Sequence, residues 1–205
     1  MVWNVRFVTL VGIVVAAAAM RLLPHPPNVA PIAAIALYGG AHFASKRAAV
    51  AVPLLAMCLS DLLLGFGVHR VMPFVYGSFA LTVVLGRLIG DRRSTLAVGG
   101  AALTGSVLFF VITNLGVWLL SDLYPRTVEG LVACYVAAIP FFRNTLAGDL
   151  LYAGALFGGF ALAERRFPAL RRQSLPVLCF EGLPRFRAII RQQRGRPGGN
   201  SYRRP

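Results

Sequence analysis

The amino-acid sequence predicts an all-α fold, a polytopic transmembrane bundle of about six helices. Of the 205 residues, 57% are hydrophobic and 14% are charged, whereas soluble domains have roughly 45–50% apolar and about 25% charged residues. The mean hydropathy is +0.69. An apolar surface of this extent could not be kept in water, and several stretches approach the roughly 20 apolar residues that span a bilayer. The chain is therefore predicted to be an integral membrane protein.

The first apolar stretch has two interpretations. Arg6, the apolar run after it and the small residues Ala17 and Ala19 resemble a secretory signal peptide. The run continues into Leu22 and Leu23, however, and the predicted bundle needs an even number of helices. We therefore expect a retained transmembrane helix.

The remaining spans follow from the same apolar pattern. The second is short, and it can gain length from Pro26 and Pro27, because proline is tolerated in the first turn of a helix. In chain order the predicted spans are Val5–Leu23, Val29–Ala44, Ala48–Phe66, Met72–Ile89, Thr95–Leu120 and Pro140–Ala163.

A further apolar segment, Glu129–Ile139, precedes the last span. Pro140 has no N–H group, and its ring clashes with the preceding helical turn. We therefore expect Glu129–Ile139 to form an interfacial or re-entrant helix that does not continue straight into the last span.

The basic residues between the spans predict the orientation. If both ends are cytoplasmic, the short inner segments carry seven basic residues and the outer loops carry three, in agreement with the positive-inside rule. This pattern predicts a multi-pass protein of the inner (cytoplasmic) membrane with both termini in the cytoplasm. The inner residues are Arg6, Lys46, Arg47, Arg92, Arg93, Arg165 and Arg166, and the outer residues are Arg21, Arg70 and Arg126.

The composition changes after Glu164. Residues 1–164 are expected to form the bundle, and residues 165–205 a basic, proline- and arginine-rich cytoplasmic tail that is largely disordered. This tail holds 11 of the 21 basic residues, which suits attraction to anionic lipid headgroups. Nucleic-acid binding is the alternative, but the tail contains no recognisable nucleic-acid-binding module, so we expect no specific nucleic-acid partner.

Polar residues inside the apolar stretches mark a candidate site. Ionisable side chains cost about 2.5–3.5 kcal/mol at the centre of a spanning helix and by default face a cavity or the bundle interior. In the predicted orientation, Asp61, Asn114, Arg143 and Asn144 lie at one outer level, and Asp149 lies nearer the middle. Polar residues that meet at one level predict a cavity open to the outside.

A structural lock is the alternative interpretation of the same residues. An internal ion pair, such as Asp61 with Arg143, would pin helices together. Polar contacts between membrane helices average only about 0.6 kcal/mol, so a buried pair is a costly way to gain stability. We favour a functional cavity and keep the lock as the second hypothesis.

Aromatic and proline-rich segments add candidates. Phe110 and Phe142 could form an apolar ligand-facing wall, although some of the aromatic residues fit an interfacial belt. Three prolines around His25 make the loop that contains His25 and Asn28 stiff. Such a loop suits either a pocket lid or a rigid corner between two helices.

Other signals limit the function. Three scattered cysteines and three scattered histidines give no metal-ligand spacing, and we predict no metal and no cofactor. No hydrolase, P-loop or zinc-protease motif is present, so we do not expect an enzyme. Small residues at helix-packing spacing, such as Gly12 and Ala16, indicate internal packing or a docking surface for another membrane protein.

Four strings carry a family resemblance: LPHPPNVAP at residues 23–31, LSD at 59–61, FFVITN at 109–114 and AIPFFRN at 138–144. With these strings the chain resembles an uncharacterised family of small bacterial membrane proteins. That family in turn is similar to the substrate-binding S components of energy-coupling-factor (ECF) vitamin transporters. The second likeness rests on size, helix number and an outer polar layer.

The resemblance implies a function. S components have six helices, both ends inside and an outward-facing pocket roofed by the first loop, and they dock on a transmembrane coupling subunit that works with an ATPase. The sequence therefore leads to the expectation of a solute-binding or uptake subunit that captures an unknown small molecule from outside. The alternative is a non-transporting scaffold or cell-envelope assembly protein. The expected substrate-binding residues are Asp61, Asn114, Phe110, Phe142, Arg143, Asn144, Asp149, His25 and Asn28.

Overall fold

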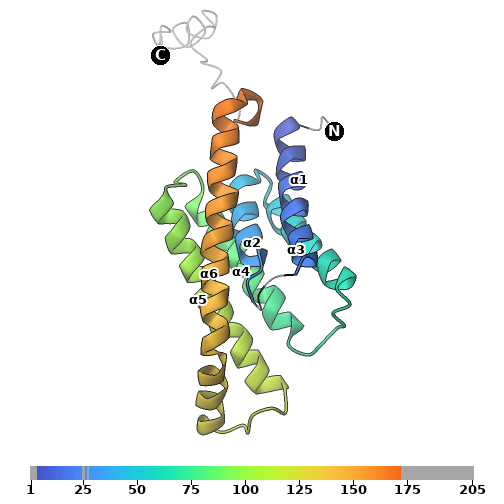
Figure 1. Cartoon of the computed structure of the whole chain (residues 1–205), viewed down its shortest axis with the longest axis vertical. Coiled ribbons are helices and arrows are strands. Elements are labelled where there is room, and N and C mark those ends of the chain that lie inside the picture. Colours follow the sequence, from blue (N-terminus) through green and yellow to red (C-terminus); the bar gives the residue numbers. More distant parts are fainter. Residues whose placement is uncertain (1–3, 25, 27, 172–205) are drawn as a thin grey trace, which may run out of the picture. The chain divides into compact units, whose positions relative to one another are not determined.

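The computed structural model describes residues 4–24, 26 and 28–171, and the chain is all-helical over these residues (Figure 1). The predictions for His25, Pro27 and the tail from residue 172 onward concern residues outside this described part. The α-helices are α1 (Val5–Ala19), α2 (Ile32–His42), α3 (Lys46–Leu63), α4 (Met72–Ile89), α5 (Thr95–Leu120) and α6 (Val128–Arg166), with short 3₁₀ turns η1 (Met20–Leu22) and η2 (Pro168–Leu170).

Within the described residues, four helices are long and apolar enough to cross a bilayer: Val5–Leu22, Met72–Ile89, Thr95–Leu120 and Val128–Arg166. These confirm that the chain is a membrane protein, and the predicted bounds of α4 and α5 are correct. The remaining two helices, α2 and α3, are not candidate spans by length and composition. With 11 residues, α2 is about 16 Å long, well short of a roughly 30 Å hydrocarbon core, and α3 carries three charged residues, Lys46, Arg47 and Asp61.

The expected break at Pro140 is wrong, because α6 runs unbroken from Val128 to Arg166 with Pro140 inside it. A proline removes one hydrogen bond and crowds the turn before it. Membrane helices tolerate this because neighbouring helices and small local adjustments satisfy the freed groups. Helix α6 packs against α5, a tertiary contact that can offset this cost. Pro53 lies inside α3 in the same way.

Successive helices run in opposite directions, so the bundle has two distinct ends (Figure 1). We call the end with Val5 and Arg166 the termini end, and the end with the α5–α6 connection the hairpin end. Helices α3 and α5 begin at the termini end with a serine N-cap. The Ser45 and Ser94 hydroxyls accept hydrogen bonds from backbone N–H groups in the first turns of these helices.

The short helix α2 forms the centre of the bundle. All of its residues from Ala33 to His42 are buried, and it packs against α4, α3 and α6. It meets α4 where Gly40 and Gly86 face each other. A Cβ atom on Gly40 would collide with the Val83 carbonyl oxygen, and one on Gly86 with the Leu37 carbonyl oxygen. Only glycines allow the two backbones to approach so closely.

Candidate functional site

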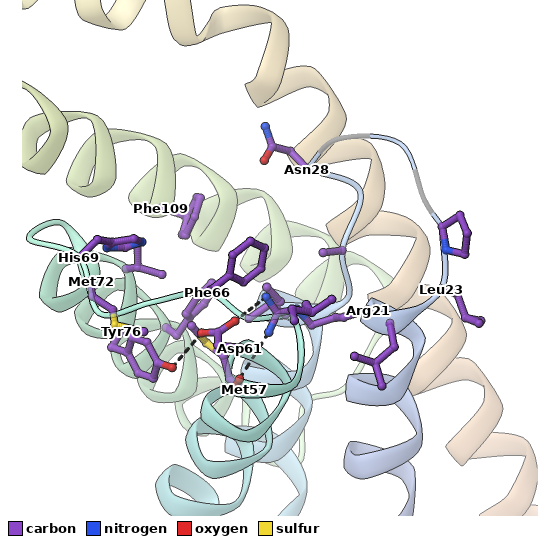
Figure 2. A pocket seen from close by; sticks show the side chains of 17 residues that line it. Arg21, Leu23, Asn28, Met57, Asp61, Phe66, His69, Met72, Tyr76 and Phe109 are labelled. Carbon is purple, nitrogen blue, oxygen red and sulfur yellow. Dashed lines mark hydrogen bonds and ion pairs between the residues drawn. The ribbon is translucent and has the colours of Figure 1, made fainter. Parts of the chain in front are cut away.

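A polar cluster toward the hairpin end lines a cavity of about 690 Å³. We call it the main cavity. Its wall comes from the end of α1, the loop before α2, the end of α3, the start of α4 and the middle of α5 (Figure 2). Most lining side chains are apolar, among them Met57, Phe66, Phe79 and Phe109.

Asp61 is the centre of a hydrogen-bonded network on the cavity wall. Its Oδ1 lies 2.7 Å from Nη2 of Arg21, and both side chains are 8% exposed. The Tyr76 hydroxyl donates to Oδ2 of Asp61 over 2.9 Å. Arg21 also donates to Oγ of Ser60 and to the Met57 carbonyl oxygen. Figure 2 shows Asp61 between Arg21 and Tyr76. The network links α1, α3 and α4 and carries no net charge.

Arg21 is a residue of the candidate site that sequence reasoning missed. In the sequence, Arg21 counts among the basic residues of the predicted outer loops. In the structure, η1 extends α1 by one turn and brings Arg21 into the bundle, where it is buried. The ion pair that the lock hypothesis requires therefore exists, but with Arg21 as the partner of Asp61 in place of Arg143. A signal was available: Arg21 follows an apolar run without a helix breaker before Pro24.

The loop before α2 closes the other side of the main cavity. Asn28 has a positive φ of 63°, a conformation that asparagine adopts more readily than most residues. The next residue, Val29, passes close to α6: a Cβ on Gly148 would lie 3.2 Å from the Val29 Cα. Since α2 alone is too short to span, this loop reaches membrane depth, where irregular backbone is tolerated only if protein covers it or it lines a cavity.

A smaller hollow of about 210 Å³, the side cavity, lies between α5, α6 and the same loop. Asn28 and Phe109 line both cavities. Phe110 and Phe142 pack against each other with ring centroids 4.9 Å apart, and Nδ2 of Asn114 donates to the Phe110 carbonyl oxygen over 2.8 Å. The side cavity therefore gathers Asn28, Phe110, Asn114 and Phe142, which are all predicted site residues.

The other predicted residues do not join these cavities. Arg143 is exposed, and with Asn144 it lines a separate surface hollow on α6 beside Pro140. Asp149 is buried between α5 and α6, where the Ser106 hydroxyl lies 2.6 Å from its Oδ2. The expectation that Asp61, Asn114 and Arg143 meet in one hollow is not met, because residue level along a helix does not fix which way the side chain points. His25 lies outside the described residues.

No group of three or more His, Cys, Asp or Glu side chains in the described part of the chain could hold a metal ion. The cavities offer apolar contacts and hydrogen bonds from a small number of polar groups.

No curated protein and no solved structure matches the chain. A family model does match, over residues 2–170, which include every span, both cavities and the Arg21–Asp61 pair. The chain therefore belongs to the family of unknown function DUF6580.

Proposed function

We propose that this protein binds a small molecule in the main cavity and is a solute-capture subunit of a membrane uptake system. The observation that carries the proposal is the cavity itself. A hollow of about 690 Å³ lined mainly by apolar and aromatic side chains, with a few converging polar groups, has the size and chemistry of a small-molecule site, which is typically about 300–1,000 Å³.

The polar network indicates the class of solute. The charges of Arg21 and Asp61 compensate each other at 2.7 Å, so a charged solute would have to compete with an existing ion pair. Hydrogen-bonding groups at Asn28, His69 and Tyr76 line the rest of the wall. These features favour a neutral, largely apolar or aromatic solute with one or two hydrogen-bonding groups.

The position of the cavity suits capture from outside. The distribution of Lys and Arg favours cytoplasmic termini in the bacterial inner membrane, and in that orientation the hairpin end with the main cavity faces outward. The loop that contains Asn28 then acts as a wall of the entrance. This arrangement is the one expected from the resemblance to ECF S components.

A partner in the membrane is part of this proposal. Gly12 and Ala16 on α1 are exposed, and nothing lies within 4 Å of a Cβ built on Gly12. A small-residue surface of this kind permits close docking of another helix, such as that of a transmembrane coupling subunit served by an ATPase.

The scaffold hypothesis stays as the second candidate because of one observation. Asp61 has partners for both carboxylate oxygens, Arg21 and Tyr76, as a helix lock requires. In that case the main cavity would be a packing defect and would show no selectivity for solutes.

A cavity-filling variant separates the two candidates. Ala30 lines the main cavity, so Ala30→Phe would fill it, whereas Ala155→Phe adds the same ring to an exposed position on α6. The thermal unfolding of the purified wild type and both variants is measured in detergent against a panel of vitamins, nucleobases and other neutral solutes. A solute at a concentration 100-fold above its Kd stabilises a folded protein by about 2.7 kcal/mol.

The solute-capture proposal expects a compound that stabilises the wild type and Ala155→Phe but not Ala30→Phe. Equal responses of all three proteins to every compound would favour the scaffold.

A further inference from the structure

Asp149 is the most deeply buried carboxyl of the described residues, and the proposed solute site does not use it. It is 2% exposed and lies against Ser106, which is 0% exposed. Asp149 is in the middle part of α6, Ser106 is near the middle of α5, and both helices are candidate membrane spans. Such a residue is costly in a membrane and is usually functional, often as part of a proton relay.

No cation compensates this carboxyl. Among the described residues, none of the ion pairs includes Asp149, and α5 contains no ionisable residue at all. The titratable or charged groups on the packed helices include Tyr38 and His42 on α2 and, within two turns of Asp149 on α6 itself, Arg143 and Tyr152, of which Arg143 is exposed. An isolated ionised carboxylate is far more costly to bury than the neutral acid.

The contacts of Ser106 accommodate a proton on Asp149. The Ser106 Oγ lies 3.0 Å from the Ala102 carbonyl oxygen and 2.6 Å from Oδ2 of Asp149. A serine hydroxyl has a single proton, and a carbonyl oxygen can only accept. Two separate hydrogen bonds form if Ser106 donates to Ala102 and a protonated Asp149 donates to Ser106, whereas with an ionised Asp149 the single serine proton is shared between two acceptors.

The two side chains also separate two hollows. One turn from Asp149 toward the hairpin end, Thr145 lines the side cavity, and one turn toward the termini end, Ala153 lines a groove of about 810 Å³. Each turn is about 6 Å along the helix. On α5 the order is the same: Phe109 and Phe110 line the side cavity, and Val98 and Gly99 line the groove, with Ser106 between them.

We propose that Asp149 is a proton-exchange site in the membrane core, which takes up and releases a proton between the side cavity and the termini-end groove. On release, the O–H bond of the carboxyl breaks, its electron pair stays on Oδ2, and a water molecule that enters from one of the two hollows takes the proton. Ser106 then turns its hydroxyl from Ala102 to the carboxylate. On uptake, the same steps run in reverse.

The groove supplies a second titratable group for this path. His42 is buried and lines the groove with Phe157, and their ring centroids are 5.1 Å apart. Asp91, Arg93, Glu164 and Arg165 line the groove further toward the termini end, so the polarity of the wall rises from the buried carboxyl outward. The proposal goes beyond solute capture and does not depend on it, because a proton site can be tested without any solute.

Infrared difference spectroscopy of the purified protein in lipid nanodiscs tests the proposal, with protons themselves as the probe. The neutral carboxylic acid has a C=O stretch that is absent from carboxylates and amides and shifts when the proton is replaced by deuterium. We expect this band in the wild type at neutral pH, its shift after transfer to heavy water, and its loss in Asp149→Asn. The control Asp122→Asn removes an exposed carboxyl and should keep the band.

The stability of Asp149→Asn and the behaviour of the infrared band in the wild type together test the proton site. Asparagine has the shape of the neutral acid, so Asp149→Asn should fold with the thermal stability of the wild type, whereas an ionised Asp149 held by donors would be poorly replaced by the amide. Absence of the band in the wild type at neutral pH, or a band that does not shift in heavy water, would overturn the proposal. If Asp149→Asn does not fold, Ser106→Ala provides a second test, because it removes the hydrogen-bond partner of Asp149. This variant should change the frequency of the C=O band. An unchanged frequency would also overturn the proposal.

Discussion

Arg6 and Glu164 are 158 positions apart in the sequence, and their side chains meet at 2.6 Å at the termini end. Arg6 is buried, also donates to the Leu170 carbonyl oxygen, and lies 5.2 Å from the centroid of the Phe160 ring. The first helix is thus attached to the end of the last one. This contact favours the retained helix over a cleaved signal peptide, because removal of α1 would leave Glu164 without this partner.

The first prediction concerns this ion pair. Arg6→Gln should lower the free energy of unfolding by about 3 kcal/mol, the cost of breaking a buried pair from one side. Thermal and denaturant unfolding of the purified protein in detergent measure the change. Arg47→Gln removes an exposed arginine at the same end and should have little effect. Equal stability of the two variants would show that the Arg6 contacts contribute nothing.

The second prediction identifies the partner of Asp61. Asp61→Asn and Arg21→Met should each destabilise the bundle, and the double variant should lose less than the sum, with a coupling of about 0.5–3 kcal/mol. The same cycle with Arg143→Gln should be additive within about 0.5 kcal/mol, because Arg143 is exposed and lines a different hollow. Coupling of Asp61 to Arg143 and not to Arg21 would contradict the structure.

The third prediction concerns the crossing of α2 and α4. Gly86→Ala places a methyl group against the Leu37 carbonyl oxygen, so the two helices must move apart and the protein should lose several kcal/mol of stability. Gly100→Ala, at an open and exposed position on α5, should be neutral or stabilise by up to about 1 kcal/mol through helix propensity. Unfolding in detergent compares the two, and a stable Gly86→Ala protein would contradict the close crossing.

The fourth prediction concerns orientation. In a variant without Cys58, Cys134 and Cys179, a single cysteine at Asp122 in the hairpin-end loop should react in intact cells with a membrane-impermeant thiol reagent. A single cysteine at Ser45, at the termini end, should react only after the cells are opened. The opposite pattern would place the main cavity on the cytoplasmic side and exclude capture from outside.

Much of the fold could be predicted from the sequence, because apolar length determines where membrane helices form. The bounds of α4 and α5 are correct, and those of α1 and α3 differ by a few residues. The failure at Pro140 has a physical cause. The local cost of a proline can be read from the sequence, but the packing of α6 on α5 that offsets this cost is a tertiary property.

The candidate site was harder to predict. Asp61 was identified because a charge inside an apolar helix is unusual, yet its partner was not, because Arg21, near the end of the predicted span Val5–Leu23, was counted with the charges of the outer loops. Asn114 and Arg143 were predicted to share one hollow, but Asn114 faces the side cavity whereas Arg143 is exposed on α6. Side-chain direction depends on the rotation of each helix, which the positions of single polar residues do not determine.

The length of α6 has a consequence for the surrounding lipid. Its 39 residues correspond to about 58 Å, nearly twice the hydrocarbon thickness of roughly 30 Å, and exposed apolar side chains run along it from Val128 to Leu162. An upright helix would leave part of this surface in water. Hydrophobic mismatch of this kind is relieved by tilt or by local thickening of the bilayer, each at a modest cost per Å. Acyl-chain length should therefore tune the stability of this protein, with thicker bilayers favouring the folded hairpin.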